Sequence, residues 1–243
     1  MKSRRQKTRK TILIISFLLF PATFLYFSPV LIIEGSAEGI ITGSFLLFGF
    51  LFVSSFFLGR AFCGWVCPGS IIQDYIAEIN TRKIKRGNII KWIIWVPWIL
   101  AIVFTAFRNG GYNKIDPLYK TTYGFSVNNV FSLFIYLCVL MLIVLPAFTI
   151  GRRSFCRSIC WMAPFMILGK KTSNLLNLKS LRLSAHPGLC TDCKLCTKNC
   201  PMDLPVNTMI LEYNTEKNDC ILCGRCVDIC KTKAITYDFC KLK

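Results

Sequence analysis

The sequence predicts an α-helical membrane protein with a small, cysteine-rich α+β domain at its C-terminal end, and three observations support this fold class. Hydrophobic residues make up 53% of the 243 residues, and the mean hydropathy of +0.50 is too high for an ordinary soluble domain of this size. Four apolar stretches are each long enough to cross a bilayer. The 14 cysteines include two runs of four near the C-terminus.

The four apolar stretches are expected to form transmembrane helices that pair as two hairpin repeats. They cover approximately residues 12–33, 39–58, 89–107 and 129–150. Prolines lie within three of them, which membrane helices tolerate and which often mark bends. We therefore expect a four-helix transmembrane domain over residues 1–169.

The basic residues predict the orientation of these helices. Residues 1–185 carry 22 Lys and Arg but only 5 Asp and Glu, whereas residues 186–243 carry 8 and 7. Of the 22, 19 lie in the three segments that would share one side of the membrane. Because cytoplasmic loops are enriched in Lys and Arg, both termini are expected in the cytoplasm, with the chain in the cytoplasmic (inner) membrane. This placement of the charge between apolar stretches argues against a nucleic-acid partner.

The two C-terminal cysteine runs have the spacing of a bacterial ferredoxin. Residues 190–201 read CTDCKLCTKNCP and residues 220–230 read CILCGRCVDIC, both C-x2-C-x2-C-x3-C. In this pattern the fourth cysteine of each run ligates the other of two [4Fe–4S] clusters. Lys231 stands where the motif usually has proline. The predicted ligands are Cys190, Cys193, Cys196 and Cys230 for the first cluster, and Cys220, Cys223, Cys226 and Cys200 for the second. The spacing predicts a ferredoxin-like domain over residues 189–243, tethered by a linker over residues 170–188.

A second cysteine motif occurs once in each predicted hairpin repeat. Residues 59–69 read GRAFCGWVCPG and residues 151–164 read GRRSFCRSICWMAP, so each has Gly-Arg ahead of a C-x3-C pair. Because the repeats run in the same direction, both pairs are expected at the cytoplasmic face, where the four thiols can meet. These are Cys63, Cys67, Cys156 and Cys160. Three interpretations stay open: a third cluster whose charge nearby arginines offset, reversible redox thiols or transient metal contacts, and a purely structural role.

An amphipathic helix is expected after the first cysteine pair, lying on the membrane surface. Its apolar side would carry Ile71, Ile72, Tyr75, Ile76 and Ile79, with Asp74 and Glu78 on the opposite side.

The combined motifs resemble those of the polyferredoxin membrane proteins of the NapH, NosR and CcoG type. The resemblance extends from the second apolar stretch to Cys230, and it is greatest to the short NapH-type quinol-dehydrogenase membrane subunit of nitrate reduction. It implies four core helices, cytoplasmic iron–sulfur clusters, and electron exchange with a membrane quinone or a partner redox protein. The chain departs from the family pattern at Trp161, which follows Cys160 where the family has proline.

We therefore expect a membrane-bound iron–sulfur electron carrier that works between a quinone pool or cytoplasmic donor and a partner redox enzyme. The alternative is an accessory factor that reduces or transfers a metal such as copper for a neighbouring metalloenzyme; a third is a passive anchor for a redox complex. His186 is the one histidine, and no haem-attachment, P-loop or dinucleotide-binding motif occurs. We accordingly expect neither haem nor a nucleotide cofactor.

Overall fold

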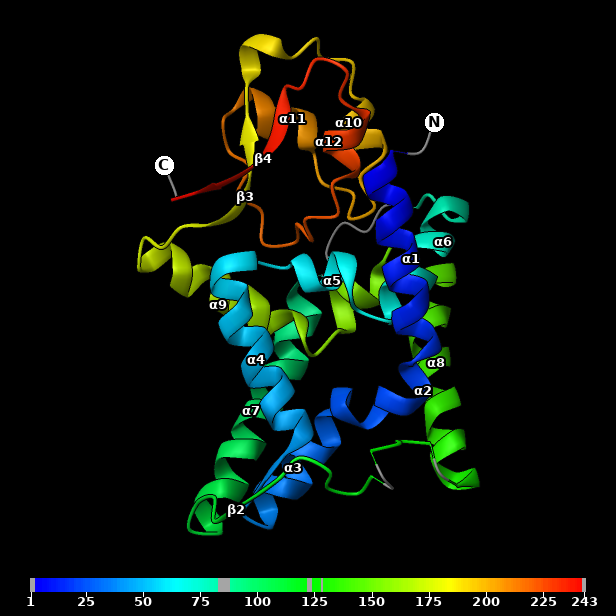
Figure 1. Cartoon of the computed structure of the whole chain (residues 1–243), viewed down its shortest axis with the longest axis vertical. Coiled ribbons are helices and arrows are strands. Elements are labelled where there is room, and N and C mark those ends of the chain that lie inside the picture. The colour runs from blue at the N-terminus through cyan, green and yellow to red at the C-terminus, as the bar shows by residue number, and fades with distance from the viewer. Residues whose placement is uncertain (1–2, 83–87, 122–123, 128, 242–243) are drawn as a thin grey trace.

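The computed structural model describes residues 3–82, 88–121, 124–127 and 129–241, and it is mostly helical with two small sheets. The long helices α7 (Asn88–Arg108) and α8 (Val130–Thr149) extend toward one end of the molecule, and short helices with a β-ribbon form the other (Figure 1). Both long helices are apolar and long enough to cross a membrane. Only 11% and 17% of their apolar windows are buried inside the protein, which leaves wide surfaces for lipid.

The first predicted span, residues 12–33, is broken into four pieces. They are α1 (Arg4–Leu18), α2 (Phe20–Thr23), the 3-10 turn η1 (Phe24–Phe27) and α3 (Pro29–Ala37). Pro21 and Pro29 lie in the first turn of α2 and α3, because proline lacks an N–H and suits that position. The axis bends by 57° between α1 and the α2–η1 piece.

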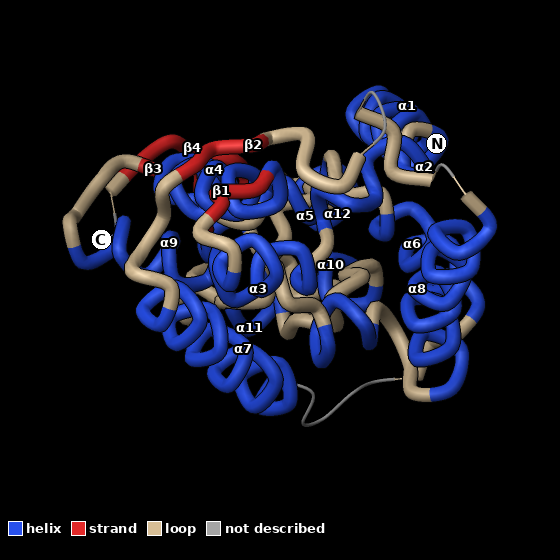
Figure 2. Tube along the Cα trace, turned by 90° about the horizontal axis from the view of Figure 1, so that it is seen from below, coloured by secondary structure: helices blue, strands red, loops and turns tan. Residues whose placement is uncertain are grey.

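The second predicted span forms α4 (Gly43–Leu58), an apolar helix of 16 residues that is shorter than α7 and α8. Before it, β1 (Ile40–Thr42) pairs in parallel with β2 (Lys114–Asp116), so the loops that follow α3 and α7 meet. Seen along the long axis, α7 and α8 stand apart, with α3 beside α7 (Figure 2). In the described part of the chain, two helices qualify as complete spans, or three if the bent α1–η1 pair counts as one.

In each repeat, the apolar helix (α4 in the first repeat and α8 in the second) is followed by a glycine, then by a short helix that carries a cysteine, and then by a further helix. The first repeat uses Gly59, α5 (Ala61–Trp65) and α6 (Gly69–Ile79), and the second uses Gly151, the π-helical turn η2 (Phe155–Ile159) and α9 (Ala163–Leu175). Both glycines have positive φ, 53° and 143°, a backbone region that favours glycine. The chain therefore changes direction at the same point in both repeats.

The two repeats exchange their last helices. Helix α6 packs against α8, and α9 packs against α4. Gln73 Nε2 donates to the carbonyl of Ile143 at 2.6 Å, and Ser173 Oγ donates to the carbonyl of Phe56 at 2.6 Å. A Cβ at Gly169 would collide with α4, so glycine is what permits this close approach. The exchange places both cysteine segments between the repeats.

Helix α6 forms where an amphipathic helix was predicted, and Ile71 and Ile76 are buried and Glu78 is exposed as expected, but the predicted exposure of Asp74 was wrong. The Asp74 side chain is only 1% exposed, whereas Tyr75 and Ile79 are 48% and 74% exposed. The physical reason is that Arg9 and Arg153 contribute buried guanidinium groups to the carboxylate. Their charge and hydrogen bonds offset the cost of removing Asp74 from water.

The C-terminal part is built on an antiparallel pair of strands, β3 (Ser180–Ala185) and β4 (Ile235–Cys240). Between them lie η3 (Pro187–Leu189), α10 (Leu195–Lys198), α11 (Val206–Leu211) and α12 (Arg225–Ile229). The segment predicted as a linker, residues 170–188, holds the end of α9 and the whole of β3. Because β3 pairs with β4 along its full length, residues 180–185 are part of the folded C-terminal unit, whereas residues 170–175 belong to α9.

Candidate metal centres

The two C-terminal cysteine runs adopt the same backbone path, 30 residues apart. Asp192 and Lys194 in the first run have left-handed backbones, and so do Leu222 and Gly224 at the equivalent positions of the second. Only one of these four is glycine, and left-handed backbone is unfavourable for the other three. We call residues 190–196 the outer loop and residues 220–226 the inner loop.

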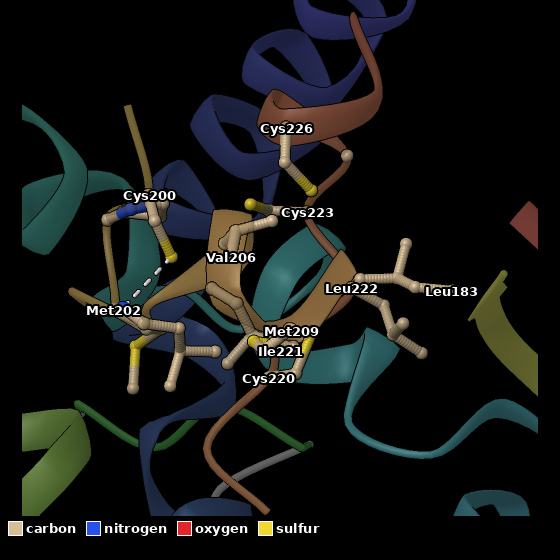
Figure 3. A pocket seen from close by; sticks show the side chains of 13 residues that line it. Leu183, Cys200, Met202, Val206, Met209, Cys220, Ile221, Leu222, Cys223 and Cys226 are labelled. Carbon is tan, nitrogen blue, oxygen red and sulfur yellow. Dashed lines mark hydrogen bonds between the residues drawn. The ribbon is translucent and has the colours of Figure 1, made fainter. Parts of the chain in front are cut away.

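Four thiols from both runs line one small cavity (Figure 3). Cys220, Cys223 and Cys226 come from the inner loop, and Cys200 comes from the first run. The rest of the wall is largely apolar, with Met202, Val206 and Met209 among its residues. Burial, together with neighbouring thiols, raises the pKa of Cys200 to about 12, so metal ligation must displace its proton. We call these four cysteines the inner set; four thiols crossing between two runs fit a [4Fe–4S] cluster.

The other predicted ligands, Cys190, Cys193, Cys196 and Cys230, form what we call the outer set. Cys196 lies buried in α10. Burial is the main reason why its pKa is raised, and the nearby Cys193 raises it further. Cys230 directly follows α12, and α12 packs against α10. Cys193 is exposed, so this set lies nearer to solvent than the inner set. Within the described residues, no three His, Cys, Asp or Glu side chains converge on a single-ion site.

The four C-x3-C cysteines line a second, larger cavity of about 280 Å³. Cys63 lies in α5 and Cys156 in η2, and Cys67 and Cys160 lie just after these turns. We call them the thiol quartet. Burial, followed by the nearby thiols, raises the pKa of Cys160 to about 12. The exchange of helices between the repeats therefore brings together all four thiols that the sequence singled out.

The remainder of this cavity is apolar and reaches toward the candidate spans. Phe20 and Phe24 contribute from the broken first segment, Ile135 and Val139 from α8, and Trp161 from the second repeat. The cavity therefore has a thiol end and an apolar end.

Arg60 lines the same cavity, and its guanidinium group is only partly hydrogen-bonded. Its side chain is 1% exposed, and Nη1 donates to the carbonyl of Asn218 at 3.0 Å. Its Nε and Nη2 atoms have no partner among the described residues, and the same holds for Nη1 of buried Arg153. Because buried donors in proteins are usually paired, these atoms suit an acceptor or anionic group at this position. A cysteine-ligated cluster on the quartet carries negative charge and fits this requirement.

The inner loop contacts the first C-x3-C loop directly. Trp65 Nε1 donates to the carbonyl of Leu222 at 2.9 Å. A Cβ at Gly64 would collide with the carbonyl oxygen of Ile221, so the two loops are in backbone contact. Gln6 Nε2 of α1 donates to the carbonyl of Cys223 at 3.0 Å. The thiol quartet, the inner set and the outer set therefore lie on successive, touching elements.

Comparison with known proteins agrees with this arrangement. Residues 40–87 and 131–175 match a family described as "4Fe-4S binding domain", once in each repeat, and residues 189–235 match a "4Fe-4S dicluster domain". The chain is 25% identical to the ferredoxin-type protein NapH of Haemophilus influenzae, over 86% of this chain and 74% of NapH. It is 24% identical to the putative electron transport protein YccM of Escherichia coli, over 82% of this chain and 56% of YccM. The chain belongs to the NapH-like polyferredoxin family.

Further relatives of this NapH-like protein extend the comparison. A protein of Methanocaldococcus jannaschii, MJ0750, is 22% identical over 96% of this chain and 94% of its own length. No solved structure matches the chain. As a NapH-like protein, the chain is a 4Fe–4S electron-transfer protein, and its two long apolar helices indicate a membrane protein.

This NapH-like chain also contains a charged centre that the sequence analysis missed. The carboxylate of Asp74 accepts hydrogen bonds from Arg9 and from Arg153, whose Nε and Nη2 lie 3.0 and 2.6 Å away. Arg225 of the inner loop forms an ion pair with it at 3.2 Å. Against the effect of burial, these three arginines hold the pKa of Asp74 well below its usual range. One ionised carboxylate thus joins α1, both repeats and the inner loop.

Proposed function

We propose that the protein relays electrons between a donor or acceptor in the membrane, such as a quinone, and a partner redox enzyme. The observation that carries this proposal is the unbroken sequence of contacts from the thiol quartet to the inner set and on to the outer set. The quartet lies at the membrane end of this path, and the outer set lies at the solvent end. A carrier with one of its ends in lipid and the other in water requires this order.

The cysteines hold the redox groups in this proposal. The outer set and the inner set would each ligate one [4Fe–4S] cluster, and the thiol quartet would ligate a third. When bound, such clusters supply reversible one-electron transfer. The protein supplies the thiolates and a buried environment. Arg60 and Arg153 place positive charge next to the quartet, which offsets its negative charge and raises its reduction potential.

The membrane topology of the proposal has four crossings, with both termini in the cytoplasm and the chain in the inner membrane. Helices α7 and α8 supply two crossings, and the bent α1–η1 segment and α4 supply the others. The distribution of Lys and Arg supports this orientation. The transmembrane domain would then cover residues 1–169, and the ferredoxin-like domain residues 189–243 together with strand β3.

The apolar end of the quartet cavity is the proposed entry for a quinone head group. Its volume of about 280 Å³ is close to the ~300 Å³ lower limit of typical ligand pockets. Aromatic and aliphatic walls suit a flat, lipid-soluble molecule, and Phe20 and Val139 lie on segments that we place in the membrane. A ligand bound there would touch the wall that the thiols form.

The test is the iron and acid-labile sulfide content of the anaerobically purified protein. At four irons per cluster, three clusters predict about 12 Fe per chain and two predict about 8. The proposal expects about 12 in the wild type and about 8 when all four quartet cysteines are changed to serine. Equal iron in both proteins would remove the third cluster from the proposal.

A second candidate function, handling of a soft metal such as Cu(I), is favoured by one observation. The Sδ atom of Met166 lies 3.8 Å from the Sγ atom of Cys63, and Met162 lines the quartet cavity. Thiol and thioether groups together are typical Cu(I) ligands. Titration with Cu(I) against a competing chelator separates the two functions, because a cluster-filled relay takes up no stoichiometric copper and a copper carrier does. Met166→Leu should weaken any such uptake.

A further inference from the structure

The two C-terminal loops share one backbone path but have opposite surroundings. Residues 221–224 of the inner loop are all buried, because the first C-x3-C loop and α1 cover them. The equivalent residues of the outer loop, 191–194, are all exposed. Burial of the inner loop follows from docking within the chain. The exposed copy of the same loop is therefore the surface where the path of cysteines meets the outside.

Charge is distributed unequally around this C-terminal unit. Three of its acidic side chains form ion pairs with bases of residues 3–175, which we call the membrane-side region: Asp228 with Arg5, Asp219 with Arg60 and Lys91, and Glu216 with Lys170. Three of the seven acidic residues after residue 185 are thus paired on the inner side, whereas Glu212 and Asp238 are exposed. The lysines that follow the cysteines of the outer set remain at the surface.

The exposed surface combines positive charge with apolar side chains. Lys194 lies in the outer loop, and Lys231 and Lys233 follow Cys230, a cysteine of the outer set; all three are exposed. Leu189 and Leu195, at the two ends of the outer loop, are 53% and 41% exposed. We call these five residues the outer-loop patch.

The one carboxylate in the outer loop offsets only part of this charge, because it lies beside Lys194 and the ion pairs of the described residues include neither Lys231 nor Lys233. Asp192 accepts a hydrogen bond from Asn207 and lies 3.8 Å from Lys194, so it is engaged within the protein. Lysines around an apolar centre fit a partner with carboxylates around an apolar centre. The unit that carries the patch lies beyond the ends of the long apolar helices (Figure 1), so a soluble protein can reach it.

We propose that the outer-loop patch is the docking surface for a soluble, acidic, one-electron redox protein. This inference rests on the proposed relay function and names the kind of partner that the solvent end accepts. Each encounter passes one electron: the outer site changes its oxidation level by one, and the carrier of the partner changes by one in the opposite sense. No bond or proton is transferred at the surface. Complementary charge accelerates such encounters by about 10- to 1,000-fold at low salt.

The test uses the full chain in nanodiscs of uncharged lipid, with flavodoxin as the acidic probe and cytochrome c as the basic one. The affinity for dye-labelled probe is measured first, without any redox step, and the rate of electron transfer to the probe second. The patch variant is Lys194→Glu with Lys231→Glu. Its matched control is Lys171→Glu with Lys179→Glu, which makes the same change of charge at two exposed lysines on α9 and next to β3.

The proposal expects flavodoxin to bind and to accept electrons, with affinity and rate both at least 10-fold lower in the patch variant and changed less than 2-fold in the control. Both quantities should fall as salt rises, and cytochrome c should not bind. Equal losses in the two variants, or none in either, would overturn the docking surface. Loss of binding to phosphatidylglycerol vesicles in the patch variant, with flavodoxin unaffected, would assign the patch to lipid and also overturn it.

Failure of the relay itself would look different. In that case the binding of flavodoxin would keep its dependence on the patch, but the iron content or the transfer of electrons would be absent in the wild type as well. If only the docking surface is wrong, iron content and chemical reduction would be normal. The rate of electron transfer to flavodoxin would then be the same in the wild type and in the patch variant.

Discussion

The protein contains two different pairs of repeats, the two C-terminal cysteine runs and the two hairpin repeats, and each pair brings cysteines together in its own way. In the C-terminal unit, the inner set takes three cysteines from one short loop and the fourth, Cys200, from the other run, and we propose the same arrangement for the outer set. In the membrane-side region, each repeat supplies only two, and the quartet exists because α6 packs on α8 and α9 packs on α4. The first arrangement depends mainly on local backbone geometry, whereas the second depends on tertiary packing. The quartet should therefore be the more fragile of the two.

The largest effect is expected at Asp74, which joins the two regions. Asp74→Asn removes the charge that compensates three arginines, and breaking a buried ion pair of this kind costs about 3–5 kcal/mol. We expect a large loss of thermal stability and of iron from the quartet and the inner set. Glu78→Gln on the same helix is the control, because Glu78 is 47% exposed and should cost under ~1 kcal/mol. Similar losses of stability and iron in both variants would show that Asp74 does not join the two regions.

The pH dependence of this effect follows from the lowered pKa of Asp74. The folded carboxylate is more acidic than the unfolded one, whose pKa is about 3.9. Its stabilisation is therefore fully present above that value and is lost as the pH falls through the folded pKa. The stability difference between the wild type and Asp74→Asn should stay constant from pH 8 to pH 5 in urea unfolding. A difference that changes within this range would mean that Asp74 is not ionised as described.

A smaller effect, confined to the quartet, is expected at Gly169. Gly169→Ala places a methyl group against Ser55 and the backbone of α4 and should cost about 1–3 kcal/mol. The iron content should fall from about 12 toward about 8, because the C-terminal sets do not depend on the contact of α9 with α4. Gly49→Ala, in α4, is the matched control, since no described atom lies within 4 Å of the new methyl group. Loss of all iron in Gly169→Ala would show that the two regions are not separable.

The smallest effect is expected at Trp65, where the two regions touch. Trp65→Phe removes the hydrogen bond to the carbonyl of Leu222, but the Tyr237 hydroxyl donates to the same oxygen. A loss of about 0.5–1.5 kcal/mol is therefore expected, with iron content unchanged. The double variant Trp65→Phe, Tyr237→Phe should lose more than the sum of the single losses, because only then is the carbonyl left unsatisfied. Additive losses in unfolding experiments would contradict this.

The sequence was sufficient for features that depend on spacing and on length. The two long spans could be predicted from hydropathy, and Cys200 lies with the second run as the ferredoxin pattern requires. Prolines indicated possible bends, but not that the first span breaks near Pro21 and Pro29 while α7 and α8 continue through their prolines, because hydropathy does not change across the break. Strand β3 escaped detection because its partner β4 begins about 50 residues later.

The charged centre at Asp74 could not be predicted from the sequence for a related reason. The position of Asp74 in an amphipathic pattern indicates the solvent side, and only its partners reverse that assignment. Arg9 is 65 residues away in sequence and Arg153 is 79. One signal was available in the sequence. The Gly-Arg-Arg motif and the basic α1 carry like charges, so they can pack together only with an acidic residue between them. Pairing of this kind requires the three-dimensional arrangement.

The central claim is that electrons reach the C-terminal cysteine sets through the thiol quartet. The most direct measurement is the reduction of these sets by a quinol in proteoliposomes, followed by electron paramagnetic resonance, in the wild type and in the variant with all four quartet cysteines changed to serine. The account predicts rapid reduction in the wild type and at least 100-fold slower reduction in the variant, which should still hold about 8 Fe and accept electrons from dithionite. Equal rates of reduction by quinol in the two proteins would contradict it.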